Sequence, residues 1–299
     1  MSVMRTVEAV PSRVVGVAHF LLSCKSGQEQ QSKVEAMMSP PTLKNVPEDG
    51  ATTSAGESMI RNVVRECCAM GLCSSQDDVL RLAPEVLESF PKLRFDSEKM
   101  RSTLRRLILR SQPDANKDLG YMLTWFMEQD PINFGIGKGD RRVALVTELR
   151  QQTGVGQLQV TNNSIVDNFT YWAVYLGFAW KMNIGGTGSE RLVPDPTPFM
   201  TGQLPELLPV GETVPLSSFL DRLATLCPIF RGSQWHSDLE GRRALPVREA
   251  QYLSPALGFA FKRLEERGRL RLVSRGDADA LLLRFDGQTQ NLSHLERLL

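Results

Sequence analysis

The chain has 299 residues, of which 41% are hydrophobic and 23% are charged, and its formal net charge at pH 7 is +1. This length is enough for two or three domains with their own cores, and the balanced charge excludes a strong overall field for nucleic acid or membrane. The five cysteines form no repeating framework, and no stretch approaches the roughly 20 apolar residues of a membrane span. We therefore expect a reduced, cytoplasmic protein.

Residues 1–84 predict three helices followed by a short strand. Helices are expected over residues 11–24 and 28–38 and from residue 57, where apolar side chains recur at helical spacing. Gly71 ends the third helix, because glycine adopts the left-handed C-cap conformation without a steric penalty. Residues 74–78 are polar and predict a turn before a strand at residues 79–82. This order is typical of a winged-helix module.

Residues 85–117 predict a helical bridge, with an amphipathic helix over residues 97–109. Its polar side carries the densest basic run of the chain, namely Arg101, Arg105, Arg106 and Arg110. A solvated face is the simpler interpretation of this run, and a contact with an anionic partner is the alternative.

Residues 118–196 predict a second, winged-helix-like module. Helices are expected over residues 119–129, 141–151 and 163–182, followed by a glycine-rich turn at residues 185–188 and a strand at residues 191–194. Gly177 corresponds to Gly71, although here the helical pattern continues beyond the glycine. The third helix is rich in aromatic residues, which fit a buried face better than a contact with another protein.

Residues 197–299 predict a third module. Helices over residues 197–207 and 216–226 precede a polar segment, and Ser254 and Pro255 then begin a helix as its cap and its first-turn proline. Gly268 ends this helix, and residues 270–272 and 281–285 predict a β-hairpin with its tip at residues 275–277. The corresponding Gly71, Gly177 and Gly268 indicate internal repetition. The predicted fold is mainly α with short β hairpins, arranged as tandem winged-helix (helix-turn-helix) modules.

Patterns that carry catalysis are missing from the sequence. None of His19, His236 and His294 has a cysteine or carboxylate at metal-ligand spacing. The glycine-rich segment at residues 135–140 lacks the ending of a nucleotide-binding P-loop, and no serine-nucleophile elbow occurs. We therefore expect no enzyme, no cofactor and no metal site.

Basic residues gather in the third module, where residues 216–275 contain eleven Lys or Arg against six Asp or Glu. The third helix of the first module is a weaker candidate, because Glu57 and Glu66 lie beside Arg61 and Arg65. A local excess of positive charge is what DNA phosphates require. The residues predicted to bind DNA are Lys262, Arg263, Arg267, Arg269, Arg271 and Arg275, with Arg101, Arg105, Arg106 and Arg110 as a secondary basic face.

Four short segments resemble a known family. They lie at residues 11–14 (PSRV), 38–43 (MSPPTL), 193–198 (VPDPTP) and 253–257 (LSPAL). They look like the DpdG component of bacterial DNA 7-deazaguanine modification and restriction clusters, and the resemblance covers most of the chain. It implies a non-catalytic accessory protein in phage defence that works beside ATPase, helicase and nuclease subunits.

We therefore expect a non-catalytic adaptor or DNA-contacting subunit of a bacterial anti-phage assembly, with no membrane partner and with oligomers allowed. A sequence-specific winged-helix transcription regulator is the alternative, and it would show a strong sequence preference in a random-oligonucleotide selection. A pure protein scaffold would instead bind no DNA at moderate salt and would co-purify with its partners.

Overall fold

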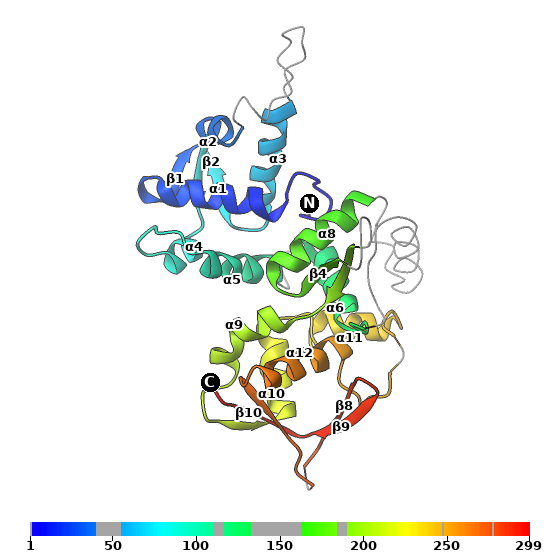
Figure 1. Ribbon diagram of the computed structural model, residues 1–299. Helices are drawn as coiled ribbons and strands as arrows, with labels where there is room; N and C mark the ends of the chain where they lie inside the picture. The colour runs from blue at the N-terminus through cyan, green and yellow to red at the C-terminus, as the bar shows by residue number, and fades with distance from the viewer. Residues whose placement is uncertain are drawn as a thin grey trace. The chain divides into compact units, whose positions relative to one another are not determined.

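The fold comprises helices and small antiparallel sheets (Figure 1). A computed structural model describes residues 2–39, 55–110, 116–132, 163–183, 190–246, 248–276 and 278–299. The chain forms two compact units, Met1–Lys117 and Asp118–Leu299. The prediction of a mainly α fold with short strands is confirmed, whereas the helix expected at residues 141–151 and both glycine-rich segments lie outside the described residues. Within the described part of the chain, no helix has the length and apolar character needed to span a bilayer.

The first unit begins with the order helix, strand, helix, helix, strand, strand. Its strands form one antiparallel sheet in the order β1-β3-β2, so that the first strand pairs with the last. The elements are α1 (Pro11–Ser23), η1 (Lys25–Gly27), β1 (Gln28–Gln30), α2 (Gln31–Met38), α3 (Ala55–Ala69), β2 (Cys73–Gln76), β3 (Val79–Leu82), α4 (Pro84–Ser89) and α5 (Ser97–Ile108).

The apolar faces expected from the sequence form the core of this unit. In α1, Val14, Val17 and Leu21 are fully buried, and in α3 Ile60 and Val63 are at most 1% exposed. Burial of such side chains is the main favourable term in folding, at roughly 25 cal/mol per Å² of apolar surface.

The turn between β2 and β3 is shorter than the polar pattern predicts. Residues 74–76 belong to β2, and the turn consists of Asp77 and Asp78, with φ of 51° and 59°. Two central residues with positive φ are typical of the type I′ turn, whose twist matches that of a hairpin.

In the second unit, the described residues form more elements and three separate sheets. Its strands pair as β4-β5, as β6-β10-β7 and as β8-β9. The elements are α6 (Lys117–Met127), α8 (Asn163–Leu176), β4 (Ala179–Asn183), β5 (Glu190–Pro194), α9 (Thr197–Leu207), β6 (Thr213–Pro215), α10 (Leu216–Leu226), α11 (Gln234–Gly241), α12 (Pro255–Glu266), β7 (Leu270–Val273), β8 (Leu281–Phe285), β9 (Gln288–Leu292) and β10 (His294–Arg297).

Two sequence expectations for this unit are wrong. The helix expected over residues 163–182 ends at Leu176, and β4 follows it. The hairpin expected between residues 270–272 and 281–285 does not form, because β7 pairs with β10 and β8 pairs with β9. The segment between β7 and β10 therefore contains a hairpin of its own.

Residues 197–297 repeat the order of elements found in residues 11–82. The helices α9, α10 and α12 correspond to α1, α2 and α3, and the sheet β6-β10-β7 has the strand order of β1-β3-β2. Helix α11 and the hairpin β8-β9 are insertions. One backbone bond also recurs: the Gln31 N–H donates to the Asp78 carbonyl at 2.8 Å, and the Leu216 N–H donates to the Ser293 carbonyl at 2.7 Å.

A helix end with the same hydrogen bonds occurs at Gly71, Gly177 and Gly268, which have φ of 80°, 87° and 64°. The residue after each glycine donates its N–H to the carbonyl five residues earlier, at 2.9 Å in all three cases. This is the Schellman motif, which requires a left-handed residue that glycine supplies. The residue after each glycine also accepts a backbone hydrogen bond of 3.0 Å from the residue that follows the returning strand. The donors are the N–H groups of Ala83, Asp195 and Leu298.

Aromatic side chains fill much of the second unit. Trp172 is fully buried, as the sequence predicts for a core residue, while Tyr171 is 45% exposed. The rings of Phe178 and Phe199 have centroids 5.0 Å apart, so the segment that follows α8 packs against α9. The regions that repeat within this unit consequently share one core.

Candidate nucleic-acid interface and a buried charged cluster

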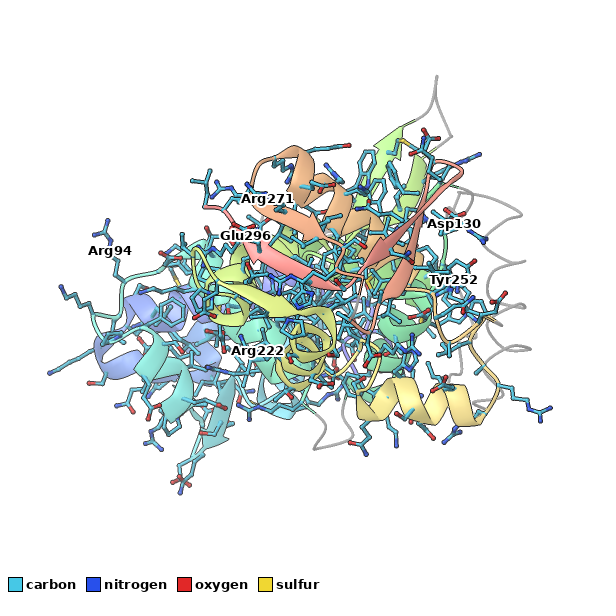
Figure 2. The ribbon with its side chains drawn as sticks, turned by 90° about the horizontal axis from the view of Figure 1, so that it is seen from below. Arg94, Asp130, Arg222, Tyr252, Arg271 and Glu296 are labelled. Atoms are coloured by element: carbon cyan, nitrogen blue, oxygen red, sulfur yellow. The ribbon has the colours of Figure 1, made fainter. Side chains whose placement is uncertain are left out.

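Three of the six cations predicted to bind DNA are paired within the protein. Arg263 forms an ion pair with Asp195, whose carboxylate is 1% exposed. Lys262 donates to Glu265 at 2.9 Å, and Arg271 contacts Glu296 at 2.9 Å on the neighbouring strand (Figure 2).

The other three, Arg267, Arg269 and Arg275, lie at the surface. Their backbones are fixed by the structure, because Arg269 belongs to the glycine motif and the Arg275 N–H donates to Ser293 Oγ at 2.9 Å. No described acidic side chain forms an ion pair with them. These three cations are therefore the ones available to a phosphate group.

Helix α12 itself is covered on most of its surface. The Phe259 ring lies 6.0 Å from the Phe285 ring of β8, and Lys262 donates to Gln290 of β9 at 2.7 Å. Further along the helix, Arg263 is held by Asp195. A helix must present a free face to enter the major groove, so α12 cannot do so with the hairpin β8-β9 in this position.

Helix α3, the corresponding helix of the first unit, has an exposed basic face. Arg61 and Arg65 are exposed, and Arg61 also contacts Glu35 at 3.2 Å. Glu66 is only 1% exposed and accepts a hydrogen bond from the Thr6 hydroxyl at 2.7 Å. The Glu66 carboxylate therefore points into the protein and does not lie beside Arg61 and Arg65 on the exposed face.

The secondary basic face on α5 is largely occupied by contacts within the first unit. Arg101 contacts Glu98 at 2.8 Å, and Arg110 forms an ion pair with Glu85. Arg105 is 9% exposed, and Arg106 donates to the Ser89 hydroxyl at 3.3 Å. The four arginines do not form one open cationic surface.

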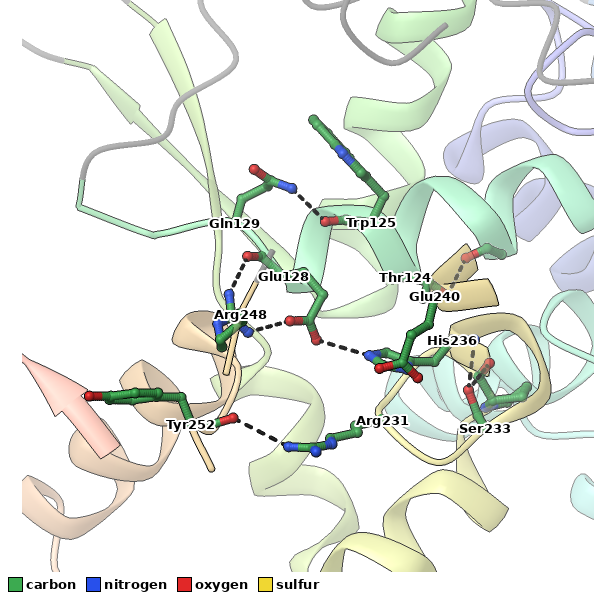
Figure 3. A network of polar contacts seen from close by, with 12 residues as sticks. Thr124, Trp125, Glu128, Gln129, Arg231, Ser233, His236, Glu240, Arg248 and Tyr252 are labelled. Atoms are coloured by element: carbon green, nitrogen blue, oxygen red, sulfur yellow. Dashed lines mark hydrogen bonds and ion pairs between the residues drawn. The ribbon is translucent and has the colours of Figure 1, made fainter. Parts of the chain in front are cut away.

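A charged cluster that no sequence motif predicts lies inside the second unit (Figure 3). Glu128, just after α6, is 8% exposed, and its carboxylate forms an ion pair with Arg248. Arg248 also donates to the Glu128 carbonyl at 2.9 Å. On its other side the carboxylate lies 3.5 Å from Nε2 of His236, which is 5% exposed.

This cluster lines a cavity of about 440 Å³. Arg231 and Arg243 also line it, together with Glu240, whose carboxylate lies 3.9 Å from His236 Nδ1, and Glu249. Cations and carboxylates balance each other there, so the cavity has no clear preference for an anion. In the described ranges, no group of His, Cys, Asp and Glu side chains could hold a metal ion. Glu128 and Arg248 are 120 residues apart, which explains why no spacing motif points to them.

The fold and these surfaces define a mainly α protein with small antiparallel sheets and separate patches of exposed arginine. A protein-family model described as DpdG-like matches residues 1–278, and the chain belongs to this family. No curated protein and no solved structure matches it. Membership of the family suggests involvement in Dpd modification systems and implies a place in a multi-protein Dpd cluster.

Proposed function

We propose that this protein is a non-catalytic adaptor or DNA-contacting subunit of the Dpd assembly, acting in the cytoplasm beside ATPase, helicase or nuclease subunits. The observation that carries the proposal is the order helix, strand, helix, helix, strand, strand, which occurs at residues 11–82 and again at residues 197–297 with the same strand order in the sheet. This is the order of a winged-helix module, a class that binds DNA or other proteins.

We also assign residues 163–195 to a further winged-helix-like module. Helix α8, Gly177 and the hairpin β4-β5 share the Schellman motif and the closing 3.0 Å bond with the other two regions.

The DNA contact that we propose for the third module is with phosphates. Arg267, Arg269 and Arg275 are exposed, whereas α12 is covered by β8-β9 and cannot reach base edges. Phosphate contacts without base contacts give binding that depends on salt and not on sequence.

The test is retention of duplex DNA by the triple variant Arg267→Ala/Arg269→Ala/Arg275→Ala. We expect weaker retention and a salt-dependence slope lower by about 2 to 3, since each phosphate contact contributes about 0.9. The matched control is Lys92→Ala/Arg94→Ala/Lys99→Ala, which removes three exposed cations from the first unit. Equal retention by both variants and the unchanged protein would exclude the proposed phosphate contact.

A sequence-specific regulator is the second candidate, and the exposed Arg61 and Arg65 on α3 favour it. Their side chains lie on one helical face, as base recognition in a groove requires. A random-oligonucleotide selection that returns a strong consensus, lost in Arg65→Ala, would support the regulator. A scaffold would bind no duplex at moderate salt and would retain its partners.

A further inference from the structure

Two cysteines meet at the junction between helix α3 and strand β2. Cys68 lies in the last turn of α3 and Cys73 is the first residue of β2, on opposite sides of the Gly71 turn. Their sulfur atoms are 3.4 Å apart, and none of the five cysteines, all of which lie in the described part of the chain, forms a disulfide. Cys73 is 3% exposed, whereas Cys68 is partly open to solvent.

We propose that Cys68 and Cys73 form a reversible oxidation site, in which hydrogen peroxide converts the two thiols into an intramolecular disulfide. A disulfide has an S–S distance of about 2.05 Å, so the two sulfur atoms have to approach each other by roughly 1.4 Å. Four residues separate the two cysteines, and Cys68 lies in the last turn of α3. A helix end allows the small backbone adjustment that this approach requires.

The reaction can be assigned to individual atoms. The hydrogen bond between the two sulfur atoms, in which either thiol can donate, lowers the pKa of Cys68, and the same bond together with burial raises the pKa of Cys73. The Cys68 thiolate attacks the peroxide O–O bond and becomes a sulfenic acid, with release of hydroxide. The Cys73 sulfur then displaces the sulfenic oxygen, and after proton transfer the balance is two thiols and one peroxide to one disulfide and two waters.

The other cysteines lack this arrangement. Burial raises the pKa of the Cys67 thiol, which is fully buried, and Cys227 is 1% exposed. Cys24 is accessible, but its thiol donates to the Phe20 carbonyl and burial raises its pKa as well. Oxidation by limited peroxide is therefore directed to Cys68 and Cys73.

The disulfide would tie the end of α3 to the start of the hairpin β2-β3. It would bridge the Schellman turn, whose two backbone bonds already hold the same elements together. This inference does not depend on the proposed DNA contact of the third module, since it concerns thiols of the first unit.

The test is mass spectrometry of the full chain after treatment with a small molar excess of hydrogen peroxide. Trypsin releases residues 66–81 as one peptide, which contains Cys67, Cys68 and Cys73. We expect this peptide to lose two hydrogen atoms, to accept one alkyl group instead of three, and to recover all three on reduction. Cys24→Ser should leave this result unchanged, whereas Cys68→Ser and Cys73→Ser should each abolish the internal disulfide.

Three results would overturn the inference. One is a peptide that still accepts three alkyl groups when peroxide has oxidised Cys24. Another is a bridge that involves Cys67, and the third is a disulfide between two chains.

Alkylation by iodoacetamide provides an independent check of the activation of Cys68. At neutral pH, iodoacetamide should alkylate Cys68 severalfold faster in the unchanged protein than in Cys73→Ala. An equal rate would contradict the proposed activation.

Discussion

Asp195 joins three elements of the second unit through one buried carboxylate. It follows β5, it accepts a hydrogen bond of 2.9 Å from the Thr197 N–H at the start of α9, and it forms an ion pair with Arg263 of α12. A carboxylate that is 1% exposed is stable only when such partners replace the water it has lost. Arg263, predicted to bind DNA, therefore has a structural partner.

A comparison of Arg263 with Arg271 provides a prediction about stability. Arg263→Ala leaves the buried Asp195 without its cation and should lower the free energy of unfolding by about 2–3 kcal/mol. Arg271→Ala, the matched control, breaks a pair in which the arginine side chain is 60% exposed and should cost at most about 0.5 kcal/mol.

Urea unfolding followed by tryptophan fluorescence measures this difference. All four tryptophans, Trp125, Trp172, Trp180 and Trp235, belong to the second unit, so the signal reports that unit alone. Equal midpoints for the two variants would mean that the Asp195 pair contributes no more than a surface contact.

At the scale of elements, the repeated helix ends allow an internal comparison. Gly177→Ala and Gly268→Ala both place a side chain at positive φ, which costs roughly 1–2 kcal/mol. A Cβ at Gly177 would also lie 3.0 Å from the Phe199 backbone nitrogen, whereas a Cβ at Gly268 would have no atom within 4 Å. We expect Gly177→Ala to lower the free energy of unfolding by at least about 1 kcal/mol more than Gly268→Ala does. The same fluorescence assay measures this difference. The reverse order would contradict the packing of the α8 end against α9.

The elements also show how far sequence reasoning reaches. Helix ends depend on local chemistry, so the ends at Gly71 and Gly268 could be predicted. The end at Gly177 could not be predicted, because the apolar pattern continues into β4, where Ala179 is buried although Trp180 and Lys181 are exposed. The pairing of β7 with β10 depends on where the inserted hairpin folds, which no local pattern records. The contacts of Glu128 with His236 and Arg248 also could not be predicted, because they join residues that are far apart in the sequence.

At the scale of the whole molecule, the repeats and the compact units do not coincide. The sequence predicts boundaries at residues 84, 117 and 196, and this division into modules stays a prediction. The structure forms two compact units, and the division between them falls after Lys117. Within the second unit, the Tyr121 hydroxyl contacts Asp238, and a Cβ at Gly120 would lie 2.3 Å from the Trp235 ring. Helix α6 thus packs closely against α11, an insertion in the last repeat.

These contacts predict how fragments of the chain behave. Residues 1–117 and 118–299 should each unfold cooperatively when expressed alone, because each keeps its own core. Residues 118–196 should not, since removing residues 197–299 leaves the Glu128 carboxylate without Arg248 and the Asp195 carboxylate without Arg263. It also exposes Phe178, which packs against Phe199.

Thermal unfolding monitored by circular dichroism distinguishes these fragments. A sigmoidal transition is expected for residues 1–117 and 118–299, and a gradual loss of signal is expected for residues 118–196. Mixing residues 118–196 with 197–299 should restore part of the transition, because the missing partners return. A sharp transition of residues 118–196 alone would mean that this repeat is an independent domain. The ion pairs of Glu128 with Arg248 and of Asp195 with Arg263 would then be a consequence of folding and not a condition for it.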